Sequence, residues 1–144
     1  MEKKVAGFRW LWPGLLVLLL DRLIKWIHLT VSEGHTVRNT GMAFGMFQGN
    51  SPVILIVSVL LVIACFFLLR NTRPSGLAPI ALSMIAGGAR GNMIDRLAYG
   101  YVIDMFKPLF MDFYIFNIAD VGVVVGAVLC AVSLRFRPQD WSEA

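Results

Sequence analysis

The sequence predicts an all-α membrane protein with four transmembrane helices, a small extracytoplasmic β-ribbon or cradle, and a second extracytoplasmic loop. Of the 144 residues, 58% are hydrophobic and only 15% are charged, whereas soluble domains carry about 25% charged residues. The mean hydropathy is +0.72. Four apolar segments also approach the roughly 20 residues that a helix needs to cross the hydrocarbon core. We therefore expect one polytopic membrane domain over residues 1–144.

The four expected spans cover residues 8–29, 52–69, 77–94 and 113–134. The first span contains Asp21 and Lys25, the second has no charge, and the third is interrupted by Arg90. The amino terminus resembles a signal peptide, but no small-residue cleavage site follows its apolar run, so we expect a retained first span. The two longer connections lie at about 30–51 and 95–112.

Basic residues near the ends of the spans orient the chain by the positive-inside rule. They gather on one side of the membrane if both termini are cytoplasmic: Lys3, Lys4, Arg9, Arg70, Arg73, Arg135 and Arg137. The two longer loops then lie outside, and residues 137–144 form a frayed cytoplasmic end. In the first outer loop, HTVRN and MAFGMF flank a Thr-Gly turn. Gly41 can supply the positive φ of such a turn, so the pattern predicts a small β-ribbon on the outer surface.

Composition also limits the function classes. The net charge of +4 is too small and too dispersed to suggest nucleic acid as a partner. Cys65 and Cys130 form no CxxC pair and have no nearby His, so we expect neither a metal site nor redox chemistry. No cofactor is expected, and we expect a monomer. Small residues at four-residue spacing, including Gly87 and Gly91, predict close helix packing.

Polar residues recur at one level of the expected bundle. Asp21 and Lys25 have the spacing of a helical ion pair. Further along the chain, polar residues cluster at the outer ends of the third and fourth spans and in the strand-like segment between them: Asn92, Asp95, Arg96, Asp104, Asn117 and Asp120. Asp95, Asp104 and Asp120 are thus expected to converge at the same depth near the outer leaflet.

A cluster of carboxylates favours proton chemistry. Two close carboxylates cannot both ionise comfortably, so one of them keeps a proton. Such a pair can activate water while protonating a leaving group, as in aspartic peptidases. A small proton-coupled transporter could use the same residues as a relay, and a non-catalytic membrane scaffold is a third possibility. Spacing alone does not choose between these functions, nor does it say which two of the three aspartates form the pair.

Five motifs in order resemble those of the lipoprotein signal peptidase family, also called signal peptidase II. They are DRLIK at 21–25, NTGMAF at 39–44, GNMIDR at 91–96, GYVID at 100–104 and FNIAD at 116–120. The resemblance implies an aspartic endopeptidase of the bacterial cytoplasmic (inner) membrane that acts on diacylglyceryl-modified prolipoproteins and meets membrane lipid. It would remove the signal peptide by cleaving before the lipidated cysteine, with no cofactor.

The same resemblance assigns roles to residues. It implies that Asp104 and Asp120 are catalytic, which leaves Asp95 as support. The supporting and substrate-binding positions that it implies are Asp21, Lys25, Asn39, Gly41, Ala43, Phe44, Gly88, Asn92, Asp95, Arg96, Asn117 and Ala119. Ile24 and Arg90 depart from the family's usual pattern. Arg90 is a charge within the third span and therefore needs a partner, for which Asp112 and a lipid phosphate are both candidates.

Overall fold

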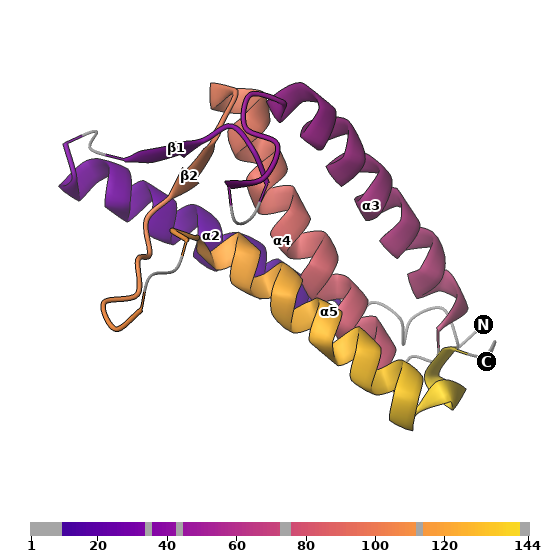
Figure 1. Ribbon diagram of the computed structural model, residues 1–144. Coiled ribbons are helices and arrows are strands. Elements are labelled where there is room, and N and C mark those ends of the chain that lie inside the picture. Colours follow the sequence, from indigo (N-terminus) through magenta and orange to yellow (C-terminus); the bar gives the residue numbers. More distant parts are fainter. Residues whose placement is uncertain (1–9, 34–35, 43–44, 73–75, 112–113, 142–144) are drawn as a thin grey trace.

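Four long helices and a two-stranded sheet make up the computed structural model (Figure 1), which describes residues 10–33, 36–42, 45–72, 76–111 and 114–141. In chain order the elements are α2 (Trp12–Val31), β1 (Val37–Asn39), α3 (Ser51–Asn71), α4 (Leu77–Tyr99), β2 (Val102–Asp104), α5 (Ile118–Phe136) and the 3₁₀ helix η3 (Pro138–Trp141). Helix α4 packs against each of the other three long helices. The sheet lies at one end of the bundle and η3 at the other (Figure 1).

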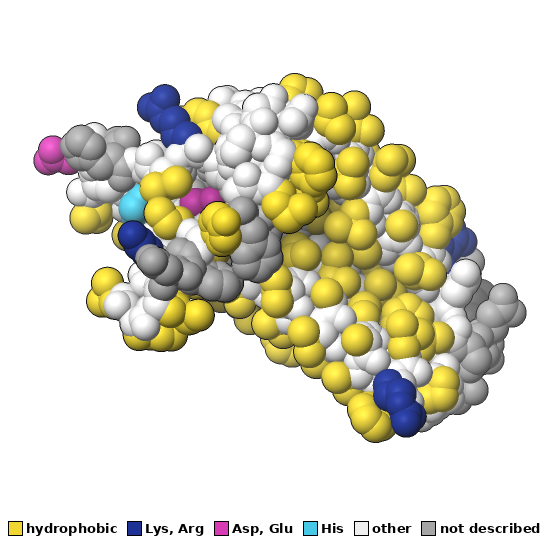
Figure 2. Space-filling model, viewed as in Figure 1, with side chains coloured by type: hydrophobic (Ala, Val, Ile, Leu, Met, Phe, Trp, Pro, Cys, Tyr) yellow, Lys and Arg dark blue, Asp and Glu magenta, His cyan; other side chains and the backbone are white. Residues whose placement is uncertain are grey.

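The outer surface of the bundle is apolar. Figure 2 shows hydrophobic side chains along the flank of the molecule, with Lys and Arg side chains toward the two ends. Leu60 of α3 and Val124 of α5 are 60% and 57% exposed. In the described part of the chain, α3 and α5 are long and apolar enough to cross a membrane by length and composition alone. Helices α2 and α4 carry Asp21, Arg22, Lys25 and Asp95, which are charged and lie within the bundle.

Small residues bring α2 and α4 into backbone contact. A Cβ atom placed on Gly87 would collide with the carbonyl group of Gly14, and one placed on Gly14 would collide with that of Ser83. The close packing that the glycine spacing predicted therefore occurs, since only hydrogen atoms fit between the two backbones at this point.

Several helix boundaries differ from the expected spans, and two of them bear on the site. Helix α5 begins at Ile118 rather than near residue 113, because Asn117 caps it. The Asn117 side chain accepts a hydrogen bond from the Asp120 N–H, and the Asp120 side chain accepts one from the Asn117 N–H, which is a reciprocal capping box. Helix α4 continues to Tyr99 and ends at Gly100, whose φ of 80° stops it. The expected loop at 95–112 therefore starts later.

The expected β-ribbon within the first outer loop is wrong in its pairing. Strand β1 pairs antiparallel with β2 of the second loop, and Val37 faces Asp104 in the register. Gly41 is required for space rather than for a positive φ, since its φ is not positive and a Cβ atom there would collide with the Met46 carbonyl oxygen. Pairing across the two loops is what brings β1 beside the end of β2.

The segment after α5 is ordered where frayed chain was expected. Asp140 in η3 is 2% exposed. Its Oδ2 atom accepts hydrogen bonds from the Leu77 N–H at 2.7 Å and the Ser133 hydroxyl at 3.3 Å. Asp140 thus satisfies a backbone N–H at the start of α4, which has no capping side chain of its own.

Candidate active site

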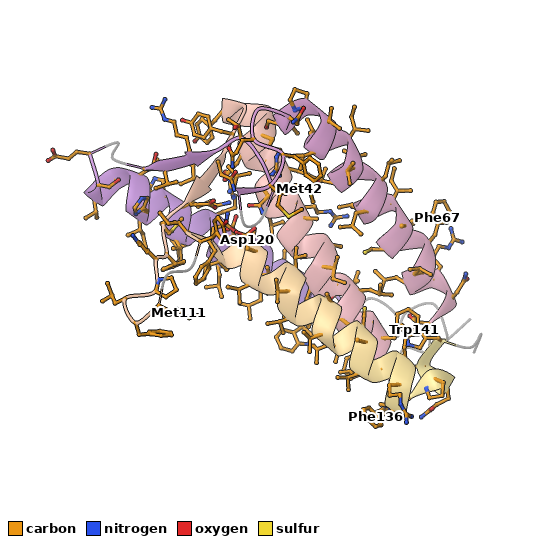
Figure 3. The ribbon with its side chains drawn as sticks, in the orientation of Figure 1. Met42, Phe67, Met111, Asp120, Phe136 and Trp141 are labelled. Carbon is orange, nitrogen blue, oxygen red and sulfur yellow. The ribbon has the colours of Figure 1, made fainter. Side chains whose placement is uncertain are left out.

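Two aspartates from separate elements lie at the sheet end of the bundle. Asp104 is the last residue of β2 and is 2% exposed. Asp120 lies in the first turn of α5 and is half-buried. Figure 3 shows Asp120 at the head of α5, facing the centre of the bundle end.

Asn117 contacts both carboxylates. Its side-chain Nδ2 donates a hydrogen bond to Asp104 Oδ1 at 2.9 Å. Its backbone N–H donates one to Asp120 Oδ2 at 3.2 Å. Asn117 is fully buried, so these donors are screened from water. One residue therefore fixes one oxygen of each aspartate.

The other carboxylate oxygens also receive amide donors. Asn39 Nδ2 donates to Asp104 Oδ2 at 3.0 Å, and Asn92 Nδ2 donates to Asp120 Oδ1 at 2.9 Å. Asn39 is itself oriented by two donors to its Oδ1 atom, the Gly41 N–H at 2.8 Å and Gln48 Nε2 at 2.9 Å. Gln48 was not predicted from the sequence, because no charge or motif marks it.

The environment of Asp104 favours its protonated form. Burial and then the charge of Asp120 raise the pKa of Asp104 to about 7, against the opposing effects of Asn39, Lys25 and Asn117. A carboxyl group that titrates near neutral pH can both hold and release a proton during a reaction. The two aspartates therefore have the electrostatic relationship expected of a pair that shares one proton.

Four charged side chains form a closed cluster between α2 and α4. Arg22 Nη2 lies 3.0 Å from Asp21 Oδ2 and 2.6 Å from Asp95 Oδ1. Lys25 Nζ lies 2.9 Å from Asp21 Oδ2 and 2.7 Å from Asp95 Oδ2. Both carboxylate side chains are fully buried. Each buried anion thus has two cationic partners, as buried charges require. The expected Asp21 and Lys25 pair is part of this larger cluster.

The cluster also holds the backbone beside each aspartate of the pair. Asp95 Oδ2 accepts a hydrogen bond from the Ile103 N–H at 3.1 Å, immediately before Asp104. Asp21 Oδ1 accepts one from the Ala119 N–H at 2.9 Å, immediately before Asp120. The two anions therefore tie β2 and the start of α5 to the helices.

Arg22 was not among the residues predicted from the sequence. The prediction rested on the four-residue spacing of Asp21 and Lys25, although Arg22 is a further charge in the same apolar helix. The Arg22 guanidinium also donates to the Gly91 carbonyl oxygen at 3.1 Å. A third charge within an expected span was the available signal, since such a charge needs a partner on another helix.

Other residues predicted for the site surround this centre. Lys25 Nζ donates to Asn92 Oδ1 at 3.2 Å, so the charged cluster reaches the Asp120 partner. Arg96 Nη2 donates to the Gly41 carbonyl oxygen at 2.8 Å. Gly88 faces Ala119, and a Cβ atom there would collide with the Ala119 carbonyl oxygen.

Ala43 and Phe44, which were also predicted to shape the site, lie outside the described residues. Arg90 is exposed on α4 and takes part in no ion pair among the described residues, and its candidate partner Asp112 lies outside them. Also within the described ranges, no group of three or more His, Cys, Asp or Glu side chains is arranged to hold a metal ion.

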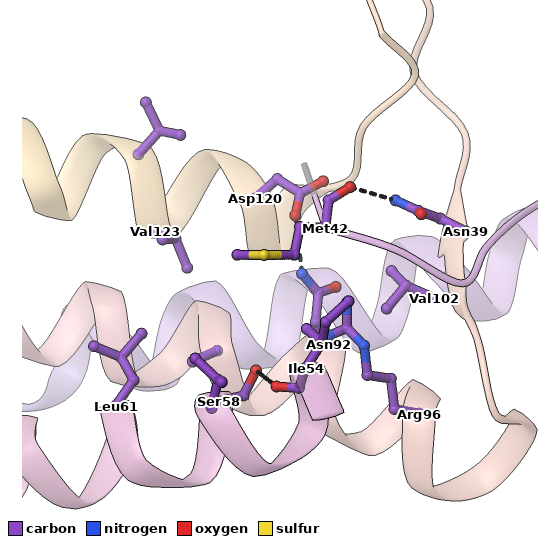
Figure 4. A pocket seen from close by; sticks show the side chains of 13 residues that line it. Asn39, Met42, Ile54, Ser58, Leu61, Asn92, Arg96, Val102, Asp120 and Val123 are labelled. Carbon is purple, nitrogen blue, oxygen red and sulfur yellow. Dashed lines mark hydrogen bonds between the residues drawn. The ribbon is translucent and has the colours of Figure 1, made fainter. Parts of the chain in front are cut away.

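An open cavity of about 170 Å³ leads from Asp120 between α3, α4 and α5 (Figure 4). Its polar end includes Asn39, Asn92 and Arg96. The rest of its lining is mostly apolar: Met42, Ile54, Val57, Ser58, Leu61, Ala89, Val102, Val123 and Val124. A second hollow of about 190 Å³ is lined in part by Asp104. Asn39 lines both hollows.

Comparison with known proteins places this arrangement in one family. The family profile described as signal peptidase (SPase) II matches residues 14–136. A lipoprotein signal peptidase of Coxiella burnetii is 34% identical over 95% of this chain and 96% of its own length. One of Pasteurella multocida is 32% identical over 99% of this chain and 100% of its own. One of Fusobacterium nucleatum is 38% identical over 85% of this chain and 83% of its own.

The fold agrees with these matches. A solved structure described as a bacterial membrane enzyme superimposes with a TM-score of 0.80 and 27% sequence identity, covering 94% of this chain and 93% of the other. A second structure with the same description has a TM-score of 0.77 and 26% identity over 90% of this chain.

Proposed function

The chain belongs to the signal peptidase II family, and from that membership we propose that it removes signal peptides from bacterial prolipoproteins. The lipoprotein signal peptidases of Coxiella burnetii and Pasteurella multocida match this chain over nearly their whole length. The alternative of a proton-coupled transporter has no support from them, and neither does a non-catalytic scaffold.

We propose an aspartic mechanism in which Asp104 and Asp120 share one proton. The ionised carboxylate takes a proton from a water molecule as the water oxygen attacks the scissile carbonyl carbon. The protonated carboxyl gives its proton to the amide nitrogen as the carbon–nitrogen bond breaks, which leaves a new carboxyl end and a free amine. The raised pKa of Asp104 supports this proposal, and the pair acts as a unit rather than with separate pKa values.

The observation that carries the proposal is the common donor Asn117. The buried residue Asn117 donates to a carboxylate oxygen of Asp104 through its side-chain Nδ2 and to one of Asp120 through its backbone N–H, which holds the two aspartates beside one another without neutralising either charge. Charge neutralisation is instead concentrated on Asp21 and Asp95, which pair with Arg22 and Lys25. Asp104 and Asp120 are thus the two site aspartates that make no ion pair among the described residues. We therefore favour them as the catalytic pair over any pair that includes Asp95.

The proposed setting is a multi-pass protein of the bacterial inner membrane with four spans and the site toward the extracytoplasmic face. Four long helices that alternate in direction support this number of spans. Basic residues at the η3 end, including Arg70 and Arg135, support cytoplasmic termini.

The proposed substrate is a prolipoprotein whose cysteine already carries diacylglycerol, cut just before that cysteine. The mostly apolar cavity beside Asp120 supports a substrate segment that enters from the hydrocarbon region. A lipid-anchored substrate would also present its scissile bond at the depth where its acyl chains meet the head groups.

The test is cleavage of a diacylated prolipoprotein by the purified protein in lipid. Asp104→Asn and Asp120→Asn are each expected to lower kcat by about 10²-fold or more, since each removes one partner of the acid–base pair. Glu33→Gln is the matched control, because Glu33 is an exposed carboxylate outside the site, and it is expected to cleave at the wild-type rate. If both site variants fold and cleave like wild type, the mechanism is wrong. Equal cleavage of the unmodified precursor would remove the requirement for diacylglycerol.

A further inference from the structure

The loop between β2 and α5 ends in an apolar tip. Leu109 is fully exposed, Phe110 is 87% exposed and Met111 is 51% exposed. The loop extends away from the helices (Figure 1), and Figure 3 shows Met111 on this extension. Three consecutive large apolar side chains in water are unfavourable, so the tip needs a partner.

The stem of this loop is closed close to both aspartates. Phe106 and Phe116 exchange backbone hydrogen bonds, with N–H to oxygen distances of 2.9 and 3.0 Å, and their ring centroids lie 5.7 Å apart. Phe106 follows Asp104 by two residues, and Phe116 precedes Asp120 by four. Because the paired stem is short, a contact that fixes the position of the tip also restricts the positions of Asp104 and Asp120.

Lipid fits the tip better than a protein partner does. The tip is convex and consists of one short turn of chain, whereas a stable protein interface buries about 800 Å² on each partner. The exposed apolar surface of the helices reaches the same end of the molecule, where Trp26 of α2 is 65% exposed and Val121 of α5 is 41% exposed. The tip thus extends a surface that already faces hydrocarbon.

A basic residue between the stem and the tip suits the membrane interface as well. Lys107 is exposed and follows the stem directly. A lysine can lay its aliphatic part along the apolar region while its ammonium group reaches lipid phosphates. An aromatic residue beside two aliphatic ones and a flanking lysine is a composition that favours the boundary between head groups and acyl chains.

We propose that Leu109, Phe110 and Met111 insert into the leaflet on the active-site side and set the depth of the Asp104 and Asp120 pair relative to the membrane. This inference rests on the proposed function only for the consequence at the site. Insertion itself is a physical property of the loop, and it can be measured with no substrate and no cleavage.

The first experiment measures insertion in nanodiscs that hold one protein chain each. Phe110→Cys is made in a Cys65→Ala and Cys130→Ala background and labelled with an environment-sensitive fluorophore. Lipids with a quencher near the head group are expected to quench this label strongly. A label on Glu33→Cys is the control and is expected to be quenched much less. Glu33 is exposed and follows the end of α2, at the sheet end of the bundle. If the two labels are quenched equally weakly, the tip stays in water and the proposal fails.

The same samples separate lipid from other occupants. Quenching that begins only after prolipoprotein is added would mean that the tip binds substrate, and this would overturn the proposal. Quenching that requires two chains in one disc would mean that the tip contacts a second copy, with the same consequence. The expected result is full quenching with one chain and no substrate. Loss of peptidase activity in the labelled protein would not change this measurement.

The second experiment asks whether insertion matters for cleavage. Leu109→Ser combined with Phe110→Ser is expected to lower kcat/KM several-fold in bilayers, where substrate depth is defined. In detergent micelles the double variant is expected to match wild type, because a micelle has no fixed depth. Phe66→Ser, which removes an exposed apolar side chain of α3 far from the site, is the matched control and should be equal to wild type in both. A double variant that equals wild type in bilayers would contradict the link to the site.

Discussion

The Asn117 side chain donates a hydrogen bond to Asp104 at 2.9 Å, from the residue that also caps the helix carrying Asp120. The start of α5 and the end of β2 are thereby joined at one buried amide. This link means that the helix cap and the geometry of the aspartate pair are not independent. Changes that separate these two roles of Asn117 are the most informative tests of the site.

Asn117→Ser should reduce cleavage more than it reduces stability. Serine is a good helix-capping residue, so α5 keeps its cap, but the donor to Asp104 is lost. We expect kcat to fall by about 10-fold or more, because one hydrogen bond to a charged group is worth roughly 1.5–3 kcal/mol. Thermal unfolding and initial cleavage rates measure the two effects.

Asn117→Ala is the comparison for that variant. It removes the cap as well as the donor, so we expect a further loss of about 1 kcal/mol in stability. If Asn117→Ser and Asn117→Ala lose the same stability, the cap does not act as the structure implies.

The stability of the protein should depend on pH through Asp104. Burial and the charge of Asp120 raise the pKa of Asp104 to about 7, so the folded state binds more protons than the unfolded state between about pH 4 and 7. The contribution of the protonated group is therefore fully present below about pH 4 and is lost as pH rises to 7. Asp104→Asn cannot ionise, so its Tm relative to wild type should rise between about pH 4 and 7.

The readout is the difference in Tm between Asp104→Asn and wild type at several pH values. About 1 kcal/mol corresponds to about 4 °C for a domain of this size, so a change of several degrees is expected. Glu33→Gln controls for a general effect of removing a carboxylate. A difference in Tm that is constant across the pH range would mean that folding does not shift the pKa of Asp104.

Arg22→Gln should lower kcat while leaving KM nearly unchanged. Arg22 contacts Asp95, which in turn holds the Ile103 N–H beside Asp104, so its effect on the site is one of position. Removing it leaves a buried carboxylate oxygen without its shortest ion pair, and we expect a stability loss of about 1–3 kcal/mol.

Arg22→Lys tests whether the geometry of the guanidinium matters. Lysine keeps the positive charge but lacks the planar fork of arginine that spans Asp21 and Asp95. We expect it to recover most of the stability and only part of the kcat. Equal kcat values for Arg22→Gln and wild type, measured well below the Tm of both, would exclude a positioning role.

Asp140→Ala should lower stability without changing catalysis. The residue lies at the opposite end of the bundle from the aspartate pair and caps the start of α4. We expect a loss of about 1–2 kcal/mol, as for other capping residues, and a normal kcat at low temperature. Asp140→Asn retains one acceptor oxygen and should lose less. A reduced kcat in the alanine variant would mean that the two ends of α4 are coupled.

Hydropathy along the chain was enough to predict the number and the approximate position of the helices. It failed at their ends, because those depend on individual hydrogen bonds. Helix α5 starts at Ile118 because Asn117 caps it, and α4 runs on to Tyr99 because the polar residues of its last turns find partners on α2 and β2. The β-ribbon was placed within one loop, since sequence patterns favour local pairing, whereas β1 pairs with β2 across 65 positions.

The residues of the candidate site were predicted in part. Asp104 and Asp120 follow from the resemblance of five motifs, and the pair of Asp21 and Lys25 follows from helical spacing. The contribution of Arg22 could not be predicted from helical spacing, because its partner Asp95 is 73 residues away. No local rule relates an arginine in one helix to an aspartate in another.

The sequence by itself determined a chain that needs an apolar solvent, with acidic residues at the ends of its helices and the motifs of one enzyme family. Only the tertiary structure decided which acidic groups of the described residues pair with cations and which accept hydrogen bonds from amide groups instead. The physical reason is that hydropathy adds up residue by residue along the chain. The charge state of a buried carboxylate, by contrast, depends on the few groups within hydrogen-bonding distance, such as the Ala119 N–H that meets Asp21 across 98 positions.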